Sequence, residues 1–396
     1  MLKIDLSSRA LFALCMVLTA MPVSAATNDV DHYTGRCIHG DDRLANCVAA
    51  AKLGSPDAAQ MLAEAYRFGW HGAQKDQAQA TYWLQVGAKL GVDNAQNALG
   101  LRYLCGLGIE KNVSQAMYWF KKASEFGKLA GLSLAGYYEQ TGLTGEANPK
   151  AALDYYIKDI KSVAYDNKLI SNYGLGVLFS EGAGVERDDK RAVEYFTMAY
   201  DQALGWSTVR AGFAGYYGGS TIPLENPSRE TLKRQLEETQ LKAESGDPKA
   251  EYQLGQIYDT GKGVQRDVSI ADKWFERAAD AGYGPAVYAR GLYYMRSPQG
   301  SGRDYAKAEF LFRQNADVNP YAKFALAYLL AGNVQGNKTD AERAEGVSLM
   351  ISAANDNNQD AQTFLAIWYA LGVHVEKDLS ISKKWWAKRM DCSHWQ

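Results

Sequence analysis

A unit of about 36 residues recurs along this chain and constrains its fold more than any other feature. The clearest copy runs from Ala250 to Gly282, and looser copies occur on both sides of it. Anchored on the leucine of a Leu-Gly pair, or on the residue in that place, the copies start at positions 62, 99, 134, 175, 213, 254, 290, 326 and 365. A sustained period of this length is typical of arrays in which each unit buries its apolar face against its neighbours. The 396 residues therefore predict one long array rather than two or three globular domains.

Each copy has the apolar pattern of two short helices. In the first helix Ala250, Leu254 and Tyr258 repeat every four residues, so they share one face. The second helix places small residues one turn before and after the bulky pair Trp274 and Phe275, which is a helical core stripe. One unit cannot bury such a stripe alone, and the pattern therefore predicts stacked helix pairs.

The turn between the two helices also has a clear pattern. Gly261 and Gly263 suit a tight turn, because glycine adopts the left-handed conformation at little cost. Asp267 is placed to cap the second helix through its side chain.

The motif from Ala250 to Gly282 reads Ala-x3-Leu-Gly-x2-Tyr-x2-Gly-x-Gly-Val-x2-Asp-x3-Ala-x2-Trp-Phe-x2-Ala-Ala-x2-Gly and resembles the Sel1-like repeat, a relative of the tetratricopeptide repeat. The resemblance covers residues 40–391; it is strongest in the second, sixth and ninth units and weakest in the fifth and eighth. It implies an all-α fold, a right-handed α-solenoid of antiparallel helix pairs. It also implies a scaffold or adaptor that binds another protein on its concave surface, and it carries over no catalytic or cofactor-binding residue.

The chain divides into four segments on this interpretation. Residues 1–25 are a signal peptide, and residues 26–54 are a polar, frayed tail followed by a lone capping helix. Residues 55–391 hold about nine repeats, of which 213–249 is atypical, and residues 392–396 are a C-terminal tail. In the first repeat we place the bulky pair at Tyr82-Trp83, and in the third we place the Leu-Gly position at Leu134-Ala135.

The N-terminus has the features of an export signal. Lys3 and Arg9 precede a short apolar run, and small residues before Ala26 predict cleavage after Ala25. The alternative is a membrane anchor, but the run is short for a bilayer and no later segment is apolar enough to span one. We therefore expect a periplasmic or secreted protein without a transmembrane segment after signal removal.

Four cysteines follow the signal, and an oxidising compartment permits disulfides between them. Cys37 and Cys47 are close in sequence at the start of the folded part, and we expect them to form a bridge. Cys105 and Cys392 lie in distant repeats, which a solenoid holds apart, so we expect both to be reduced and buried.

Charge and histidine content argue against several classes of partner. The net charge is −2, and no basic stripe stands out, so neither nucleic acid nor an anionic membrane is an expected partner. The five histidines are scattered, and there is no phosphate-binding loop. We expect no metal and no cofactor.

One enzymatic alternative remains, a penicillin-binding or β-lactamase-like hydrolase. Ser380 and Lys383 fit Ser-x-x-Lys, and residues 165–167 (Tyr-Asp-Asn) loosely fit a second motif. The two motifs come in the wrong order, Lys-Thr-Gly is missing, and Ser380 falls at the capped start of a second helix. The favoured hypothesis is a non-enzymatic adaptor of a bacterial cell envelope or of a host partner.

Function should lie where the units depart from the motif. Arg290 stands where other units carry leucine or phenylalanine, and residues 218–245 form an insertion that is either a partner-facing joint or a degenerate repeat. Tyr137, Tyr216 and Tyr293 lie beside core positions, and they either line the inner surface or are buried between units.

Overall fold

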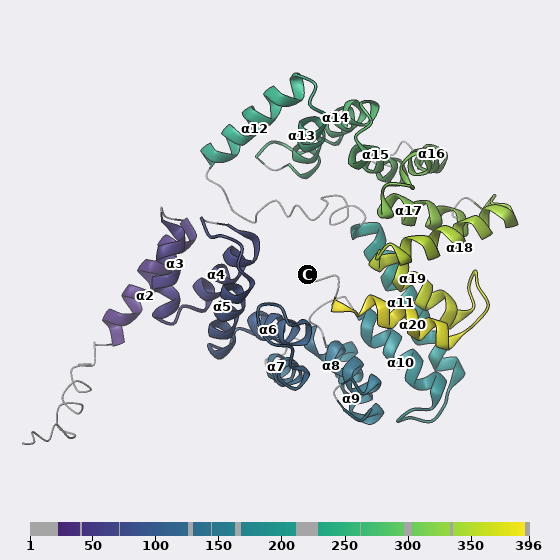
Figure 1. Cartoon of the computed structure of the whole chain (residues 1–396), viewed down its shortest axis with the longest axis horizontal. Coiled ribbons are helices and arrows are strands. Elements are labelled where there is room, and N and C mark those ends of the chain that lie inside the picture. Colours follow the sequence, from purple (N-terminus) through teal and green to yellow (C-terminus); the bar gives the residue numbers. More distant parts are fainter. Residues whose placement is uncertain are drawn as a thin grey trace, which may run out of the picture. The chain divides into compact units, whose positions relative to one another are not determined.

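The computed structural model describes residues 23–39, 42–70, 72–125, 130–143, 145–162, 168–210, 229–261, 263–296, 303–332 and 336–392. These residues form helices and turns without a strand, in two compact units that divide between residues 165 and 166. The predicted all-α array of helix pairs is confirmed (Figure 1).

Unit 1 contains four helix pairs. Its helices are α2 (Val23–His39), α3 (Arg43–Lys52), α4 (Pro56–Phe68), α5 (Gln77–Lys89), α6 (Asp93–Cys105), α7 (Val113–Glu125), α8 (Ala130–Thr141) and α9 (Pro149–Lys161). The two helices of each pair pack on each other, and the second helix of a pair packs on the first helix of the next.

Unit 2 continues the pattern of packed helix pairs, but some of its helices, such as α11 and α18, are longer. Its helices are α10 (Leu169–Glu181), α11 (Asp189–Arg210), α12 (Arg229–Glu244), α13 (Pro248–Thr260), α14 (Val268–Asp280), α15 (Gly284–Arg296), α16 (Tyr305–Asn315), α17 (Pro320–Ala331), α18 (Asp340–Asn355), α19 (Gln359–Leu371) and α20 (Leu379–Arg389). The α12 helix lies in the atypical fifth repeat and is rich in charged residues.

Local sequence signals set the helix boundaries. Asp267 caps α14, as predicted, because its side chain accepts a hydrogen bond from the backbone N–H of Ile270 at 2.9 Å. Gly261 ends α13 with φ +71° in the left-handed region, where a residue with a Cβ would be strained.

A glycine under an aromatic ring joins the two helices of five repeats. In the sixth repeat a Cβ on Gly255 would lie 2.6 Å from two ring atoms of Phe275, so only glycine lets α13 and α14 approach this closely. The same arrangement pairs Gly100 with Phe120, Gly136 with Tyr156, Gly176 with Phe196, and Gly291 with Phe312. The Leu-Gly and aromatic elements of the motif are therefore two halves of one packing contact.

The structure corrects the register of two repeats. In the first, Trp83 and Leu84 are buried whereas Tyr82 is exposed, so the bulky pair lies one residue later than we predicted. In the third, the ring of Tyr156 lies over Gly136, so the pair is Ala135-Gly136. Both errors arose because tyrosine beside the core positions resembles a core aromatic in sequence.

The N-terminus is also more ordered than a frayed tail with a lone cap. Residues 23–39 form α2, which pairs with α3. Tyr33 and Cys37 are four residues apart, and both pack into the cluster that contains Leu62 and Trp83. One face of α2 is therefore apolar enough to complete a helix pair.

The order in which repeats stack changes in unit 2. We predicted a single array with successive neighbours, but α11 of the fourth repeat packs on α19 of the ninth. This is a contact of a second helix on a first helix, the same kind that joins consecutive repeats. The ring of Tyr200 on α11 meets Phe364 on α19 with centroids 5.8 Å apart.

The partner helices α10 and α20 strengthen this junction. Tyr173 stacks on Trp386 with ring centroids 3.8 Å apart. Ser382 donates to the carbonyl of Ala366 at 2.6 Å, so the hydroxyl of Tyr173 donates to Ser382 at 2.7 Å. The fourth repeat is thereby held to the ninth by buried aromatic and polar contacts.

The described part of the fifth repeat acts as a degenerate second helix. Leu236 and Ala243 of α12 pack with Ala250 and Leu254 of α13, which favours the degenerate repeat over the partner-facing joint. Residues 211–228, including Tyr216, lie outside the described residues.

Candidate functional site

A groove of about 350 Å³ lies between the first helices of two adjacent repeats in unit 1. It is bordered by α4 and α6, with the start of α5 at its base. Its polar lining residues are Gln60, Glu64, Arg67, Gln77, Asn94 and Arg102. Its volume is typical of a site for a small ligand or a few residues of a peptide.

Helical spacing puts these side chains in the groove. On α4, Ala58, Ala59 and Leu62 face the core. Gln60 and Glu64, one turn apart, lie on the face that remains open.

Arg102 is the most unusual residue of the groove. Only 5% of its surface is exposed, yet no carboxylate of the described residues pairs with it. Its Nη1 atom donates to the side chains of Gln77 and Thr81 at 3.0 and 2.9 Å, and to the carbonyls of Gln77 and Leu107 at 3.0 and 3.2 Å. A buried cation is thus held by neutral oxygens alone, which offset only part of its lost hydration.

The charge of Arg102 is destabilised further by a second arginine. Burial, and then the nearby charge of Arg67, lower the pKa of Arg102 to about 10. Arg67 is exposed and lies over the ring of Phe68 at 4.8 Å, without an ion pair among the described residues. The groove therefore contains two guanidinium groups that the described chain leaves without a counter-ion.

Sequence reasoning missed Arg102, although the repeats carry a signal for it. The residue three positions after the repeat leucine is apolar or aromatic in the other described repeats, as in Leu178, Ile257, Leu329 and Trp368. Arg102 is the charged exception, and comparison at this position would have identified it.

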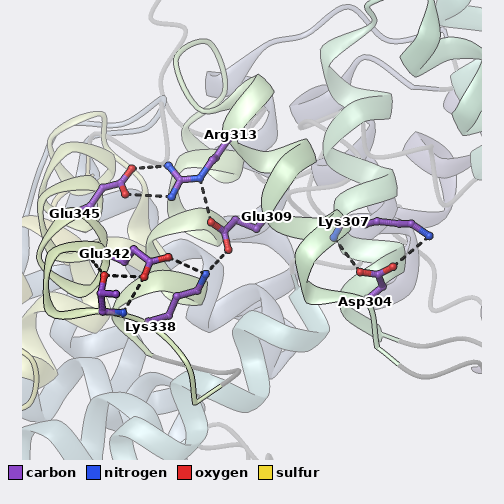
Figure 2. A network of polar contacts seen from close by, with 8 residues as sticks. Asp304, Lys307, Glu309, Arg313, Lys338, Glu342 and Glu345 are labelled. Carbon is purple, nitrogen blue, oxygen red and sulfur yellow. Dashed lines mark hydrogen bonds and ion pairs between the residues drawn. The ribbon is translucent and has the colours of Figure 1, made fainter.

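A second charged cluster joins the seventh and eighth repeats (Figure 2). Glu309 accepts from Lys338 at 2.6 Å and from Arg313 at 3.1 Å, and Arg313 also forms two parallel bonds to Glu345. Lys338 reaches Glu342 at 3.3 Å as well. Burial opposes the charge of Lys338, but its hydrogen bonds to these carboxylates outweigh burial and raise its pKa. Each charge has an internal partner, so the cluster holds α16 to α18.

Arg290, which the sequence marked as a departure, has a similar structural role. Its Nη2 atom donates to Glu276 of α14 at 2.6 Å and to the hydroxyl of Tyr294 at 3.3 Å, and its Nε lies 3.7 Å from Asp272. The guanidinium joins α15 to α14 and is not presented to a partner.

Two of the three tyrosines that the sequence marked beside core positions, Tyr137 and Tyr293, lie within the described residues. Tyr137 is buried, and burial raises its pKa to about 12. Tyr293 is half-buried. These positions therefore contribute packing area rather than an aromatic binding surface.

Of the residues of the hydrolase alternative, the structure describes Ser380 and Lys383. Ser380 is exposed near the start of α20. Lys383 pairs with Glu181 of α10 at 2.6 Å, and residues 165–167 lie outside the described part of the chain. Within the described residues there is also no cluster of His, Cys, Asp and Glu suited to a metal ion.

The four cysteines after residue 25 all take part in disulfides. A bridge joins Cys37 of α2 to Cys47 of α3. Cys105 and Cys392 are also disulfide-bonded and only partly buried, so our expectation of two reduced, buried thiols is wrong.

Several proteins resemble parts of this chain. The Sel1-repeat-containing protein YjcO of Escherichia coli is 31% identical over 152 residues, which is 37% of this chain and 62% of YjcO. The chitin synthase regulator SKT5 of Saccharomyces cerevisiae is 25% identical over 271 residues, 65% of this chain and 38% of SKT5. DAP3-binding cell death enhancer 1 of Rattus norvegicus is 32% identical over 121 residues, 31% of this chain and 24% of that protein. This chain spans less than two thirds of each relative.

Two solved structures are similar at lower identity. A protective antigen of uropathogenic Escherichia coli with an SLR fold has a TM-score of 0.39 and 21% identity, covering 92% of this chain and 76% of that one. A Sel1 repeat protein from Oxalobacter formigenes has a TM-score of 0.37 and 20% identity, covering 91% and 94%.

The Sel1 repeat model matches seven segments, residues 56–92, 93–126, 130–158, 169–204, 248–283, 284–317 and 359–388. The matches omit the fifth and eighth units, where the sequence motif is weakest. With these repeats over more than half of its length, the chain belongs to the Sel1 repeat family, whose members are typically non-enzymatic scaffolds that mediate protein–protein interactions.

Proposed function

We propose that this protein is an exported adaptor that binds a partner protein on the face formed by its first helices. The observation that carries the proposal is the groove between α4 and α6. It combines an opening large enough for a few residues of a peptide with two charged side chains, Glu64 and Arg67, that form no ion pair within the described residues. Such a mixture suits specific recognition of another chain.

Charged clusters elsewhere in the chain differ from the groove, because their charges pair with each other. The clusters around Lys338 and Arg290 use their charges to join neighbouring helices. In the groove, Glu64 and Arg67 have no ion pair within the described residues. Charged side chains that do not stabilise the fold are the ones available to a partner.

Export is supported by two features. The first is the leader-like pattern of residues 1–25, with its basic start, apolar run and small residues before Ala26. The second is the bridge between Cys37 and Cys47, because such disulfides persist in the periplasm or outside the cell. Within the described residues, no helix has the length and apolarity to cross a membrane.

The names of two relatives fit a binding role. One is described as a regulator of chitin synthase, and another as a DAP3-binding protein. Regulation of another protein and binding to one both suit the adaptor role that we propose for this chain.

Site-specific photocrosslinking tests the adaptor role. A photoreactive amino acid at Gln60 lies in the groove, and one at the exposed Tyr82 on α5 is the matched control outside it. We expect a discrete crosslinked partner from position 60 in cells and none from position 82. Equal crosslinking from both positions, or none from position 60, would refute the groove as the binding face.

The remaining parts of the proposal need separate measurements. The intact mass of protein from the periplasm or medium should correspond to a chain that begins at Ala26. The hydrolase alternative predicts nitrocefin turnover that Ser380→Ala abolishes. We expect no turnover, because Lys383 is engaged with Glu181.

A further inference from the structure

The donor atoms of Arg102 are unequally used. Its four hydrogen bonds to described residues all come from Nη1. Nε and Nη2 have no partner in the described part of the chain, and they are not sealed from solvent. Because Arg102 lines the groove, this second edge of the guanidinium is reached from there.

That free edge has a specific chemical preference. Nε and Nη2 of an arginine form a planar fork, which matches the two oxygens of a carboxylate. The bonds from Nη1 fix the side chain before a ligand arrives, so little rotamer entropy is lost on binding. Arg67 borders the same groove and adds a second positive charge, while Ala98 and Leu101 offer half-buried apolar surface.

We propose that the groove binds a carboxylate of the partner, presented by a short peptide segment with an apolar neighbour. Arg102 takes the carboxylate in a bidentate contact, Arg67 adds a charge-assisted hydrogen bond, and the apolar neighbour packs on Leu101. Glu64 lies in the same groove and opposes the anion, which limits the affinity and lowers the net charge there to about +1 from two arginines and one glutamate. The inference rests on the proposed function and adds the chemistry of the recognised segment.

Fluorescence polarisation with three labelled pentapeptides tests the proposal on the full chain. The probes are Ala-Leu-Glu-Leu-Glu with an amidated end, Ala-Leu-Gln-Leu-Gln with a free carboxyl end, and Ala-Leu-Gln-Leu-Gln with an amidated end. The first offers side-chain carboxylates, the second a terminal carboxylate, and the third none. We expect the third to bind at least tenfold more weakly than the better of the other two, and that better probe identifies the source of the carboxylate.

Charge variants make the test specific to the groove. Arg67→Gln should weaken the better acidic probe about tenfold, the effect of losing one charge-assisted hydrogen bond. Glu64→Gln should strengthen it severalfold. Arg234→Gln, which removes an exposed arginine on α12, should change the affinity less than twofold beyond the general effect of charge. Arg102→Lys keeps the charge but loses the fork, and it should weaken binding if its thermal unfolding matches the parent.

Several results would overturn the inference. They are equal affinity of the three peptides, no binding of any peptide at millimolar concentration, or equal effects of Arg67→Gln and Arg234→Gln. The peptide result separates this inference from the adaptor role, since crosslinking from Gln60 with no carboxylate preference would leave only the adaptor role standing.

Discussion

Gly291 lies beneath the ring of Phe312, where α15 meets α16. A Cβ at position 291 would be 2.3 Å from Cε1 of this ring and 2.8 Å from Cδ1 and Cζ. Phe312 is completely buried, so its ring cannot swing into solvent to make room. Gly291→Ala should therefore force the two helices apart or tilt the ring.

The expected change in the free energy of unfolding follows from two opposing effects. Alanine in a helix interior is favoured over glycine by about 1 kcal/mol, whereas overpacking a tight core costs about 1–3 kcal/mol. Gly205 in α11 is the matched control, because a Cβ there meets nothing within 4 Å. Gly205→Ala should stabilise its helix by about 0.5–1 kcal/mol. The difference between the two substitutions, about 1–3 kcal/mol, isolates the steric term.

Native-state hydrogen exchange is the suitable assay, because repeat arrays open locally and need not unfold in one step. Amides of α15 and α16 should exchange faster in Gly291→Ala than in the parent, with about tenfold for each 1.4 kcal/mol of net destabilisation. Amides of α11 should exchange more slowly in Gly205→Ala. If Gly291→Ala protects its helix pair as Gly205→Ala does, the glycine-under-ring contact is not what sets the helix spacing.

The first repeat supplies an internal check. There Ala63 takes the glycine position, and the facing residue is Leu84 rather than an aromatic ring; both are buried. Phe312→Leu should consequently relieve part of the cost of Gly291→Ala. A double-mutant cycle should give a favourable coupling between the two substitutions, and additive effects would argue that the residues do not clash.

Three further predictions test other parts of the structure. Trp386→Ala removes a buried ring that stacks on Tyr173, so it should destabilise the junction of α10 and α20 by about 3–5 kcal/mol. The amides of α10 should then exchange faster with solvent. Protection of α10 equal to that in the parent would contradict the stacking order in unit 2. Hydrogen bonds from the backbone and hydroxyl of Thr339, then from Lys338, lower the pKa of Glu342 to about 2 from 4.5. The contribution of Glu342 to stability is thus complete above the unfolded pKa and is lost as the pH falls from about 4.5 towards 2. Glu342→Gln should therefore flatten the dependence of the free energy of unfolding on pH in this range. Finally, a peptide map of the unreduced protein should show Cys37 and Cys47 joined, and replacing both with serine should lower stability by about 2–3 kcal/mol.

Local sequence determined much of this fold. Helix pairs, their glycine turns and caps such as Asp267 follow from residues that lie within one or two turns of each other, so a single copy of the motif is enough to predict them. The groove could not be predicted from local sequence in the same way. Arg102 differs from its counterparts, but only the structure places it beside Arg67 with one edge of the guanidinium free.

Tertiary structure decided which copies stack on which. The stacking faces of all repeats consist of the same small and aromatic residues, so the pattern fits α19 to α18 or to α11 equally well, and in the structure α19 packs on both. Individual contacts such as Tyr173 on Trp386 then complete the junction. The same ambiguity explains why Arg290 looked functional in sequence: its acidic partners lie on the preceding helix, where only packing brings them within reach. Periodicity thus specifies the repeat and its local contacts, while the order in which repeats stack depends on side chains that are far apart in the chain.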